Sequence, residues 1–202
     1  MTTTRVDLAG IHVPLITPFE SDGRIATDAL EQLAHQVLSE GAVGLVALGT
    51  TAEAATLTEQ ERVTVLDICA NVCRARGATL IVGAGSNDTA ASAQALGRLA
   101  RWPEVSAALV PVPSFTRPSK AGVVAHFAHL QSSSPVPLIV YHVPYRTACD
   151  LDSGTLQEVG TLPGVVGVKY AAGGIAAAAV ELFADLPGDC AVLAGDDLLL
   201  AP

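Results

Sequence analysis

The sequence predicts an α/β protein in which parallel strands and helices alternate along a chain of 202 residues. Short runs rich in valine, isoleucine and leucine recur at intervals of roughly 30 residues, the length of one strand, one helix and their loops. Residues that favour helix starts, such as Thr58 and Asn87, follow these runs. Half of the residues (50%) are hydrophobic, which can supply a core on both faces of a sheet. This alternation is typical of parallel sheets that helices cover on both sides.

The expected strands occupy the apolar runs, and the expected helices fill the segments between them. Thr58 and Glu61 have the spacing of a capping box, so a helix should begin there, and Gly77 should end it after Arg76. We expect strands at residues 10–17, 43–48, 80–85, 107–112, 137–142, 165–169 and 190–194. We expect further helices at about residues 87–101, 119–130, 152–159 and 174–184, with others starting at Thr27 and Asp196.

Two architectures fit this alternation. A doubly wound sheet that binds a dinucleotide carries G-x-G-x-x-G after its first strand, and the segment Gly83-Ala84-Gly85-Ser86 lacks the third glycine. In a (β/α)8 barrel the site lies at the carboxyl ends of the strands. Polar residues gather at those ends here, namely Thr50, Thr51, Tyr141, Lys169, Asp196 and Asp197. We therefore expect one TIM-barrel domain over residues 1–202 that lacks the last βα unit and the C-terminal helices.

Charge and composition exclude several functions. The net charge of -9 opposes binding to nucleic acid, because phosphate contacts need clustered cations. No apolar run approaches the roughly 20 residues that span a bilayer, and the N-terminus has no signal-peptide pattern, so we expect a cytoplasmic protein without membrane contact. The cysteines form no C-x-x-C pair and should be small buried hydrophobes, at positions Cys69, Cys73, Cys149 and Cys190. We expect neither a metal nor a cofactor.

Lys169 is the first candidate for a catalytic residue. It is one of only two lysines and ends the apolar run Val165-Val166-Gly167-Val168. Burial at such a strand disfavours the charged ammonium, so the pKa of the amine should fall. A neutral amine can condense with a ketone to a Schiff base. The structural alternative is a lysine whose stem packs while its head reaches solvent or a carboxylate, and the residue by itself does not decide between them.

Three further motifs accompany Lys169. Gly49-Thr50-Thr51-Ala52-Glu53 places two hydroxyls and successive backbone N–H groups at a strand-to-helix turn, where a carboxylate can be held. Tyr141-His142-Val143-Pro144-Tyr145-Arg146-Thr147 puts a phenol at a strand end and a guanidinium five residues later. Ala194-Gly195-Asp196-Asp197 forms an acidic turn, whose carboxylates we interpret as helix N-terminal residues.

The order and spacing of these four motifs resemble the dihydrodipicolinate synthase / N-acetylneuraminate lyase family of class I, Schiff-base pyruvate aldolases. The resemblance covers essentially the whole chain. It implies that Lys169 forms the Schiff base with pyruvate or a related 2-oxo acid and that Tyr141 moves protons around the adduct together with the hydroxyl of Thr50. It also implies that Thr51 holds the pyruvate carboxylate and that Arg146 holds the carboxylate of the aldehyde acceptor, in a homo-oligomer that needs no cofactor.

The chain departs from the family pattern at several positions. Phe115 stands where the family has a tyrosine that reaches into the neighbouring subunit, and a phenyl ring relays no proton. Ala52, His142 and Tyr170 replace a glycine, an asparagine and a glutamate of the family motifs. Ala52 is costly only if its backbone needs a positive φ.

Two other functions stay open at this stage. One is a non-catalytic protein that binds 2-oxo acids or serves as a scaffold, and the other is a catabolic 2-keto-3-deoxy sugar acid aldolase or dehydratase of the same family. A metal-dependent aldolase that uses His126 or His129 is disfavoured, because both lie on an expected helix away from the carboxyl ends of the strands. The missing eighth strand leads us to expect that these residues are part of a longer chain or need a partner subunit.

Overall fold

A computed structural model describes residues 6–197 of the chain. Seven strands occur in the sheet in the order in which they occur in the sequence, β1-β2-β3-β4-β5-β6-β7. The pairing is parallel between β1 and β2, β2 and β3, β5 and β6, and β6 and β7. The strands are β1 (His12–Pro14), β2 (Gly44–Ala47), β3 (Thr79–Gly83), β4 (Val105–Pro111), β5 (Leu138–His142), β6 (Val165–Tyr170) and β7 (Ala191–Ala194). This is the α/β, TIM-barrel-like arrangement that the sequence predicts.

The helices fill the intervals between strands. They are α1 (Thr27–Ser39), α2 (Glu59–Arg76), α3 (Thr89–Arg98), α4 (Lys120–Ser133), α5 (Pro144–Thr147), α6 (Ser153–Gly160) and α7 (Ala177–Asp185). Two 3₁₀ turns add to them, η1 (Thr50–Ala52) and η2 (Leu99–Arg101). The chain divides into two compact units, one made of residues 9–84 and 99–108, the other of residues 85–98 and 109 onward with the segment up to Leu8.

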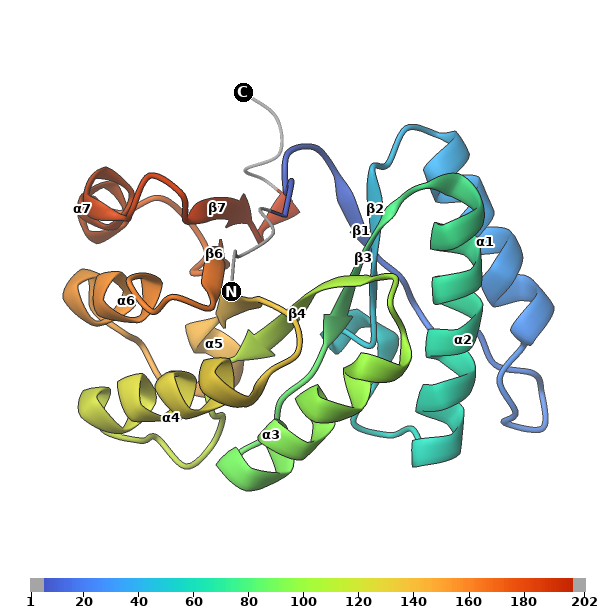
Figure 1. The fold of residues 1–202 in the computed structure, drawn as a ribbon, viewed down its shortest axis with the longest axis horizontal. Coiled ribbons are helices and arrows are strands. Elements are labelled where there is room, and N and C mark those ends of the chain that lie inside the picture. The colour runs from blue at the N-terminus through green and yellow to red at the C-terminus, as the bar shows by residue number, and fades with distance from the viewer. Residues whose placement is uncertain (1–5, 198–202) are drawn as a thin grey trace. The chain divides into compact units, whose positions relative to one another are not determined.

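The unit of residues 9–84 and 99–108 holds β1, β2 and β3, beside which α1 and α2 lie next to each other (Figure 1). Helix α2 begins at a complete capping box: the Thr58 side chain accepts from the Glu61 N–H at 3.3 Å, and the Thr58 N–H donates to the Glu61 carboxylate at 2.7 Å. Gly77 ends the helix in the left-handed conformation, with φ 63°. Both signals work as the sequence predicts.

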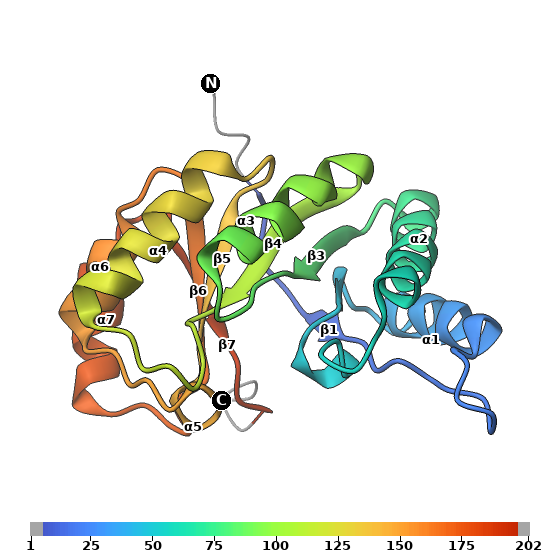
Figure 2. The ribbon, with the colours of Figure 1, turned by 90° about the horizontal axis from the view of Figure 1, so that it is seen from below.

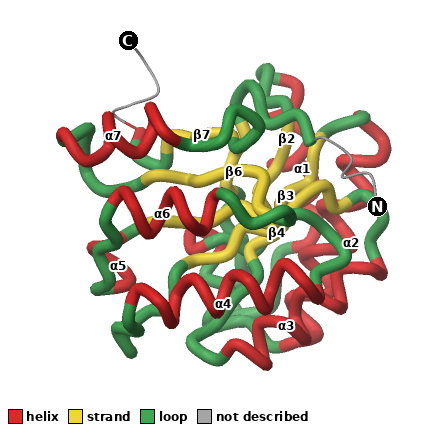
Figure 3. The backbone as a smooth tube through the Cα atoms, turned by 60° about the vertical axis from the view of Figure 1, so that its left-hand side comes forward, coloured by secondary structure: helices red, strands yellow, loops and turns green. Residues whose placement is uncertain are grey.

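The other unit holds β5, β6 and β7 with α3, α4, α6 and α7. Helices α4, α6 and α7 follow one another along these strands (Figure 2), and α3 packs beside α4 (Figure 3). Ser119 and Asp152 cap α4 and α6, each accepting a backbone N–H three residues later. The largest fully buried apolar side chains of this unit are Leu96, Phe127, Leu130, Leu138, Ile139, Leu156 and Leu182.

The structure changes several expected boundaries. The helix expected at residues 87–101 is α-helical only over Thr89–Arg98 and continues as the 3₁₀ turn η2. The sequence did not reveal η1 or α5, each of which is a single turn that begins within three residues of the end of a strand. A strand expected over residues 10–17 is confined to His12–Pro14. The helix expected from Asp196 onward falls largely on residues 198–202, which lie outside the described residues.

The cysteines are buried and free, as the sequence predicts. Burial is the main cause that raises the pKa of each of three thiols. The pKa of Cys69 rises to about 12, and those of Cys73 and Cys190 rise to about 11. These thiols are therefore packing residues rather than thiolate nucleophiles. Among residues 6–197, no helix is both long enough and apolar enough to cross a membrane.

Candidate active site

Lys169 and Tyr141 are direct neighbours on adjacent strands. Tyr141 of β5 pairs with Lys169 of β6 in the parallel register, one residue before both strands end. The Lys169 ammonium nitrogen lies 4.7 Å from the centroid of the Tyr141 ring. Tyr141 is buried, with 5% of its surface exposed, and Lys169 is half-buried. An aromatic face thus forms one wall around the amine.

The surroundings of Lys169 make its amine easier to deprotonate. Burial is the largest cause and lowers the pKa of Lys169 below its ordinary value, since it disfavours the charged form. Asp197 and Asp196 oppose this change and raise the pKa, while the positive charge of Arg146 lowers it further. The net direction is downward, as expected from the position of Lys169 at the end of a buried strand.

Asp196 fixes the turn that follows β6. Its side chain accepts a hydrogen bond from the Gly173 N–H at 2.8 Å, and the Gly195 N–H donates to the Tyr170 carbonyl at 2.8 Å. A Cβ at Gly195 would lie 2.7 Å from the Ala171 Cβ and 3.2 Å from the Lys169 Cε. The lack of a side chain at Gly195 therefore lets the turn after β7 approach the aliphatic part of the Lys169 side chain closely. The sequence interpretation of Asp196 as a helix N-terminal carboxylate missed this contact with the Gly173 turn.

Arg146 lies on the single-turn helix α5, which Pro144 opens at its first turn. Its Nε donates to the Tyr145 hydroxyl at 3.2 Å, and its guanidinium lies 5.1 Å from the centroid of the Tyr145 ring. Both side chains are exposed. No carboxylate among the described residues forms an ion pair with Arg146. The guanidinium is therefore available to an anion.

Phe115 projects from the proline-rich loop after β4. Its side chain is 86% exposed, and its backbone has φ 68°, a left-handed conformation that is unusual for a bulky residue. The Phe115 N–H donates to the Thr147 carbonyl at 3.0 Å, so the loop is tied to the end of α5. The backbone is held in place while the ring faces solvent.

His142 is a site neighbour to which sequence reasoning gave no role. Its side chain is 1% exposed, its Nε2 lies 3.5 Å from the Asp150 carboxylate, and its ring lies 5.5 Å from that of Tyr170. Burial is the larger cause and lowers the pKa of His142. The charge of Asp150 and its hydrogen bond raise the pKa but only partly offset this effect. His142 follows Tyr141 on β5, so the two side chains point to opposite faces of the strand. The alternation of side chains along a strand could have indicated this position.

Thr50 and Thr51 lie in the other compact unit, on the 3₁₀ turn η1 directly after β2. Both are exposed. Ala52 is buried, and its carbonyl accepts from the Thr17 hydroxyl at 2.7 Å. The left-handed residue of this turn is Glu53, with φ 54°, and Ala52 has no positive φ, so an alanine there is unstrained. The proposed tasks of Thr50 and Thr51 remain predictions.

Two further residues have structural tasks. Lys120, the second lysine of these 202 residues, pairs on the surface with Asp152, the N-cap residue of α6. His126 is buried between helices, where its Nδ1 lies 2.8 Å from the Thr89 hydroxyl. Neither residue lies at the carboxyl end of a strand.

The parallel sheet with its helices makes this a TIM-barrel-like protein, and it carries a half-buried lysine near the carboxyl end of β6, as its motifs predict. The Dihydrodipicolinate synthetase family profile matches residues 7–202, and the chain belongs to this family. It is 37% identical over 191 residues to a 4-hydroxy-tetrahydrodipicolinate synthase from Anaplasma marginale, covering 94% of this chain and 62% of that protein. The fold class and the family resemblance drawn from the sequence are both confirmed.

Solved structures support the same assignment. A dihydrodipicolinate synthase from Bacillus anthracis matches with a TM-score of 0.86 and 30% identity over 93% of this chain and 64% of that chain. A chloride-inhibited dihydrodipicolinate synthase from Acinetobacter baumannii, complexed with pyruvate, matches with a TM-score of 0.87 and 32% identity, again over 93% and 64%. The chain thus spans less than two thirds of the length of these relatives, as its strand count led us to expect.

Proposed function

We propose that the protein is a class I, Schiff-base lyase or synthase that joins pyruvate, or a related 2-oxo acid, to an aldehyde or runs the reverse cleavage. The observation that carries this proposal is the half-buried Lys169 amine, whose pKa burial lowers, 4.7 Å above the buried Tyr141 ring. A lysine with these surroundings is the usual nucleophile for a ketone. Membership of the family points to the same chemistry.

The chemistry follows from the amine. Neutral Lys169 adds to the C2 carbonyl of pyruvate to give a carbinolamine, which loses water to form the protonated imine. The imine acidifies the C3 protons, and loss of one of them gives an enamine whose C3 attacks the aldehyde. Each addition and elimination needs a proton donor or acceptor beside the nitrogen. The Tyr141 ring lies next to the Lys169 amine, which supports the Tyr141 phenol as this proton donor and acceptor.

The remaining roles rest on the motif resemblance and on the character of each residue. The Thr51 hydroxyl and N–H would hold the pyruvate carboxylate, and the Thr50 hydroxyl would pass protons to and from Tyr141. Arg146 has no carboxylate partner among the described residues, so its planar guanidinium can bind the carboxylate of an aldehyde acceptor. The acceptor would therefore be an acidic aldehyde.

Phe115 bears on the proton relay and on oligomerisation. Its exposed ring occupies the position from which, in the family pattern, a tyrosine reaches the neighbouring subunit. A homo-oligomer is therefore part of the proposal, and in it a phenyl ring would fill space without moving a proton. Turnover would then depend on Tyr141 and Thr50 more strongly than the family pattern implies.

Reductive trapping tests the proposal. Pyruvate with sodium borohydride should add one reduced pyruvate to the natural protein, visible by intact mass, and peptide mapping should place it on Lys169. Lys169→Arg should abolish the adduct. Lys120→Arg is the matched control, because it changes the only other lysine of these 202 residues, an exposed residue paired with Asp152. An adduct on Lys120, or one that persists in Lys169→Arg, would contradict the proposal.

A further inference from the structure

Thr17 is a buried polar residue to which the proposed chemistry at Lys169 gives no role. It lies three residues after β1, in the unit of residues 9–84 and 99–108, and only 3% of its surface is exposed. Its hydroxyl donates a hydrogen bond to the Ala52 carbonyl at 2.7 Å, across 35 positions of the sequence. Ala52 is the last residue of η1, the turn that carries Thr50 and Thr51. The bond therefore joins the end of β1 to that turn.

The backbone around Thr17 is fixed on both sides. The Leu15 N–H donates to the Val46 carbonyl of β2 at 3.1 Å. The Ala26 N–H donates to the Pro18 carbonyl at 2.9 Å. Threonine is branched at Cβ, so its side chain has few rotamers to choose from. The Thr17 hydroxyl is therefore a donor with a fixed position and direction at the carboxyl end of β1.

The turn η1 needs support from outside because the backbone on both of its flanks is strained. Leu48, which comes before the turn, has φ 54°, and Glu53, which follows it, also has φ 54°. Neither residue is a glycine, and a left-handed backbone at such residues persists only where surrounding contacts hold it. Inside the turn, the Ala52 N–H donates to the Gly49 carbonyl at 3.1 Å. The Thr17 hydroxyl adds a contact to the Ala52 carbonyl from a different strand end.

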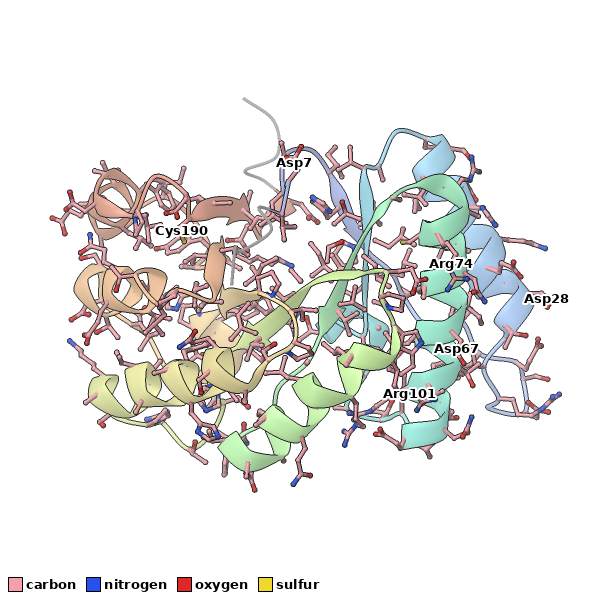
Figure 4. The ribbon with its side chains drawn as sticks, in the orientation of Figure 1. Asp7, Asp28, Asp67, Arg74, Arg101 and Cys190 are labelled. Carbon is pink, nitrogen blue, oxygen red and sulfur yellow. The ribbon has the colours of Figure 1, made fainter. Side chains whose placement is uncertain are left out.

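A separate anchor holds the segment that follows the turn. Arg62, near the start of α2, donates to the Ala54 carbonyl at 2.8 Å and to the Leu57 carbonyl at 3.3 Å. Helix α2 can be followed in Figure 4 from its labelled residues Asp67 and Arg74. Arg62 thus supports the residues between η1 and α2 rather than the turn itself.

We propose that Thr17 is a positioning residue, which through the Ala52 carbonyl directs η1 so that Thr51 meets the carboxylate of a 2-oxo acid. This inference rests on the proposed function, in which Thr51 binds that carboxylate. The bond engages the backbone of Ala52 and not the hydroxyls of Thr50 and Thr51, so Thr17 acts through the turn and touches no substrate. Loss of the bond displaces the turn, and the site then selects less strongly for a ketone that carries a carboxylate.

Reductive trapping with two ketones measures this selection. Pyruvate and acetone both present a methyl ketone to the Lys169 amine, and only pyruvate has a carboxylate. The natural full-length protein is incubated with each ketone and borohydride, and the second-order rate constant of adduct formation on Lys169 is measured by mass. The ratio of the two constants, pyruvate over acetone, should fall by at least about tenfold in Thr17→Val and in Thr17→Ala, which lack the hydroxyl. Thr17→Ser keeps the hydroxyl, and its ratio should stay within about threefold of the natural one.

Thr155→Val is the matched control. Thr155 is buried on α6, and its hydroxyl also donates a hydrogen bond, to the Asp152 carboxylate. The substitution should lower the melting temperature and leave the ratio unchanged. A general loss of stability slows the trapping of both ketones alike, so the ratio separates a positioning role from a merely structural one.

The outcomes distinguish this inference from the proposed function beneath it. If the natural protein forms the pyruvate adduct on Lys169 and a folded Thr17→Val or Thr17→Ala protein keeps the natural ratio, the positioning role is overturned and the proposed function stands. A Thr17→Ser protein whose ratio falls as far as that of Thr17→Val also overturns it, because the hydroxyl is then not what matters. A natural protein that forms no pyruvate adduct on Lys169 overturns both.

Discussion

The Lys169 ammonium nitrogen lies 4.7 Å from the centre of the Tyr141 ring, from the neighbouring position on the adjacent parallel strand. The strand register places them there. Tyr141 of β5 pairs with Lys169 of β6, so the two side chains lie on the same face of the sheet. The ring shields one side of the amine from water, and burial is the main cause of the lowered pKa of Lys169. One cross-strand pair therefore supplies both the nucleophile and its aromatic neighbour.

Tyr141→Phe separates the ring from its hydroxyl. The ring under Lys169 remains, so trapping of the pyruvate adduct by borohydride should persist. Steady-state turnover should fall by roughly 10²- to 10⁴-fold, the usual contribution of a positioned acid or base. A fully active Tyr141→Phe protein would remove Tyr141 from the proton transfers. Tyr145→Phe, which removes an exposed phenol that accepts from Arg146, is the control for loss of a phenol elsewhere and should lose much less turnover than Tyr141→Phe.

Asp197→Asn should shift the pH dependence of adduct formation toward lower pH. The negative charge of Asp197 raises the pKa of Lys169, so its removal leaves burial and Arg146 less opposed, and the pKa falls further. A larger fraction of the amine is then neutral at pH 6 to 7, and trapping should be faster there. Asp189→Asn is the control, because Asp189 has no part in the pKa of Lys169. An unchanged or alkaline-shifted profile in Asp197→Asn would contradict this electrostatic account.

His142 makes stability sensitive to acid. Burial lowers the pKa of His142, so the stability that the neutral ring contributes is fully present above its ordinary pKa of 6.5. It is lost as the pH falls from there through the lowered value in the folded protein. His142→Asn removes this titration, so its free energy of unfolding should fall less steeply than that of the natural protein between pH 6.5 and 5. Urea unfolding at several pH values measures the two slopes, and parallel slopes would rule out His142 as their source.

Thr58→Ala tests the capping box of α2. The substitution removes the acceptor for the Glu61 N–H and should lower the free energy of unfolding by about 0.5–2 kcal/mol. The Thr58 backbone N–H is the first cause of the lowered pKa of Glu61 and survives the substitution, whereas the hydroxyl that also donates to the Glu61 carboxylate is lost. The share of that hydroxyl is present above the ordinary pKa value of 4.5 and fades as the pH falls below it. Thr64→Ala, on the same helix, is the control and should change stability by less. Equal effects of both substitutions would show that the cap contributes nothing specific.

The sequence predicted the fold well wherever a local rule governs the chain. The capping box at Thr58, the glycine end at Gly77 and the caps Ser119 and Asp152 all act through contacts within a few residues. Boundaries were wrong where tertiary contacts decide. The helix expected through Arg101 changes to a 3₁₀ turn after Arg98, close to where Trp102 is held by Asp67, 35 residues away in the sequence. No local pattern reveals a partner at such a distance.

The candidate site was predictable from motifs, while its supports were not. Lys169 and Tyr141 stand out because a lysine and a tyrosine end apolar runs, and the register brings them together as parallel strands require. The Asp196 contact with the Gly173 N–H and the burial of His142 beside Tyr170 depend on how neighbouring strands and turns pack. Sequence periodicity gives the face of a strand, but it does not give the partner across the next turn.

Gly83→Ala should disturb the turn that carries Thr50 and Thr51. A Cβ at Gly83 would lie 2.1 Å from the Leu48 carbonyl oxygen and 2.9 Å from the Gly49 nitrogen, both backbone atoms that no rotamer change can move. The chain after β2 must therefore shift, at an expected cost of about 1–3 kcal/mol in the free energy of unfolding. Gly97→Ala on α3 is the matched control: nothing lies within 4 Å of its added Cβ, and alanine in a helix should stabilise by about 0.5–1 kcal/mol. Urea unfolding of both variants gives the sign of each effect.

Pyruvate trapping in Gly83→Ala should also weaken, because the shifted turn carries Thr51, which is proposed to hold the pyruvate carboxylate. A Gly83→Ala protein with unchanged stability and unchanged trapping would contradict the close approach of Gly83 to Leu48.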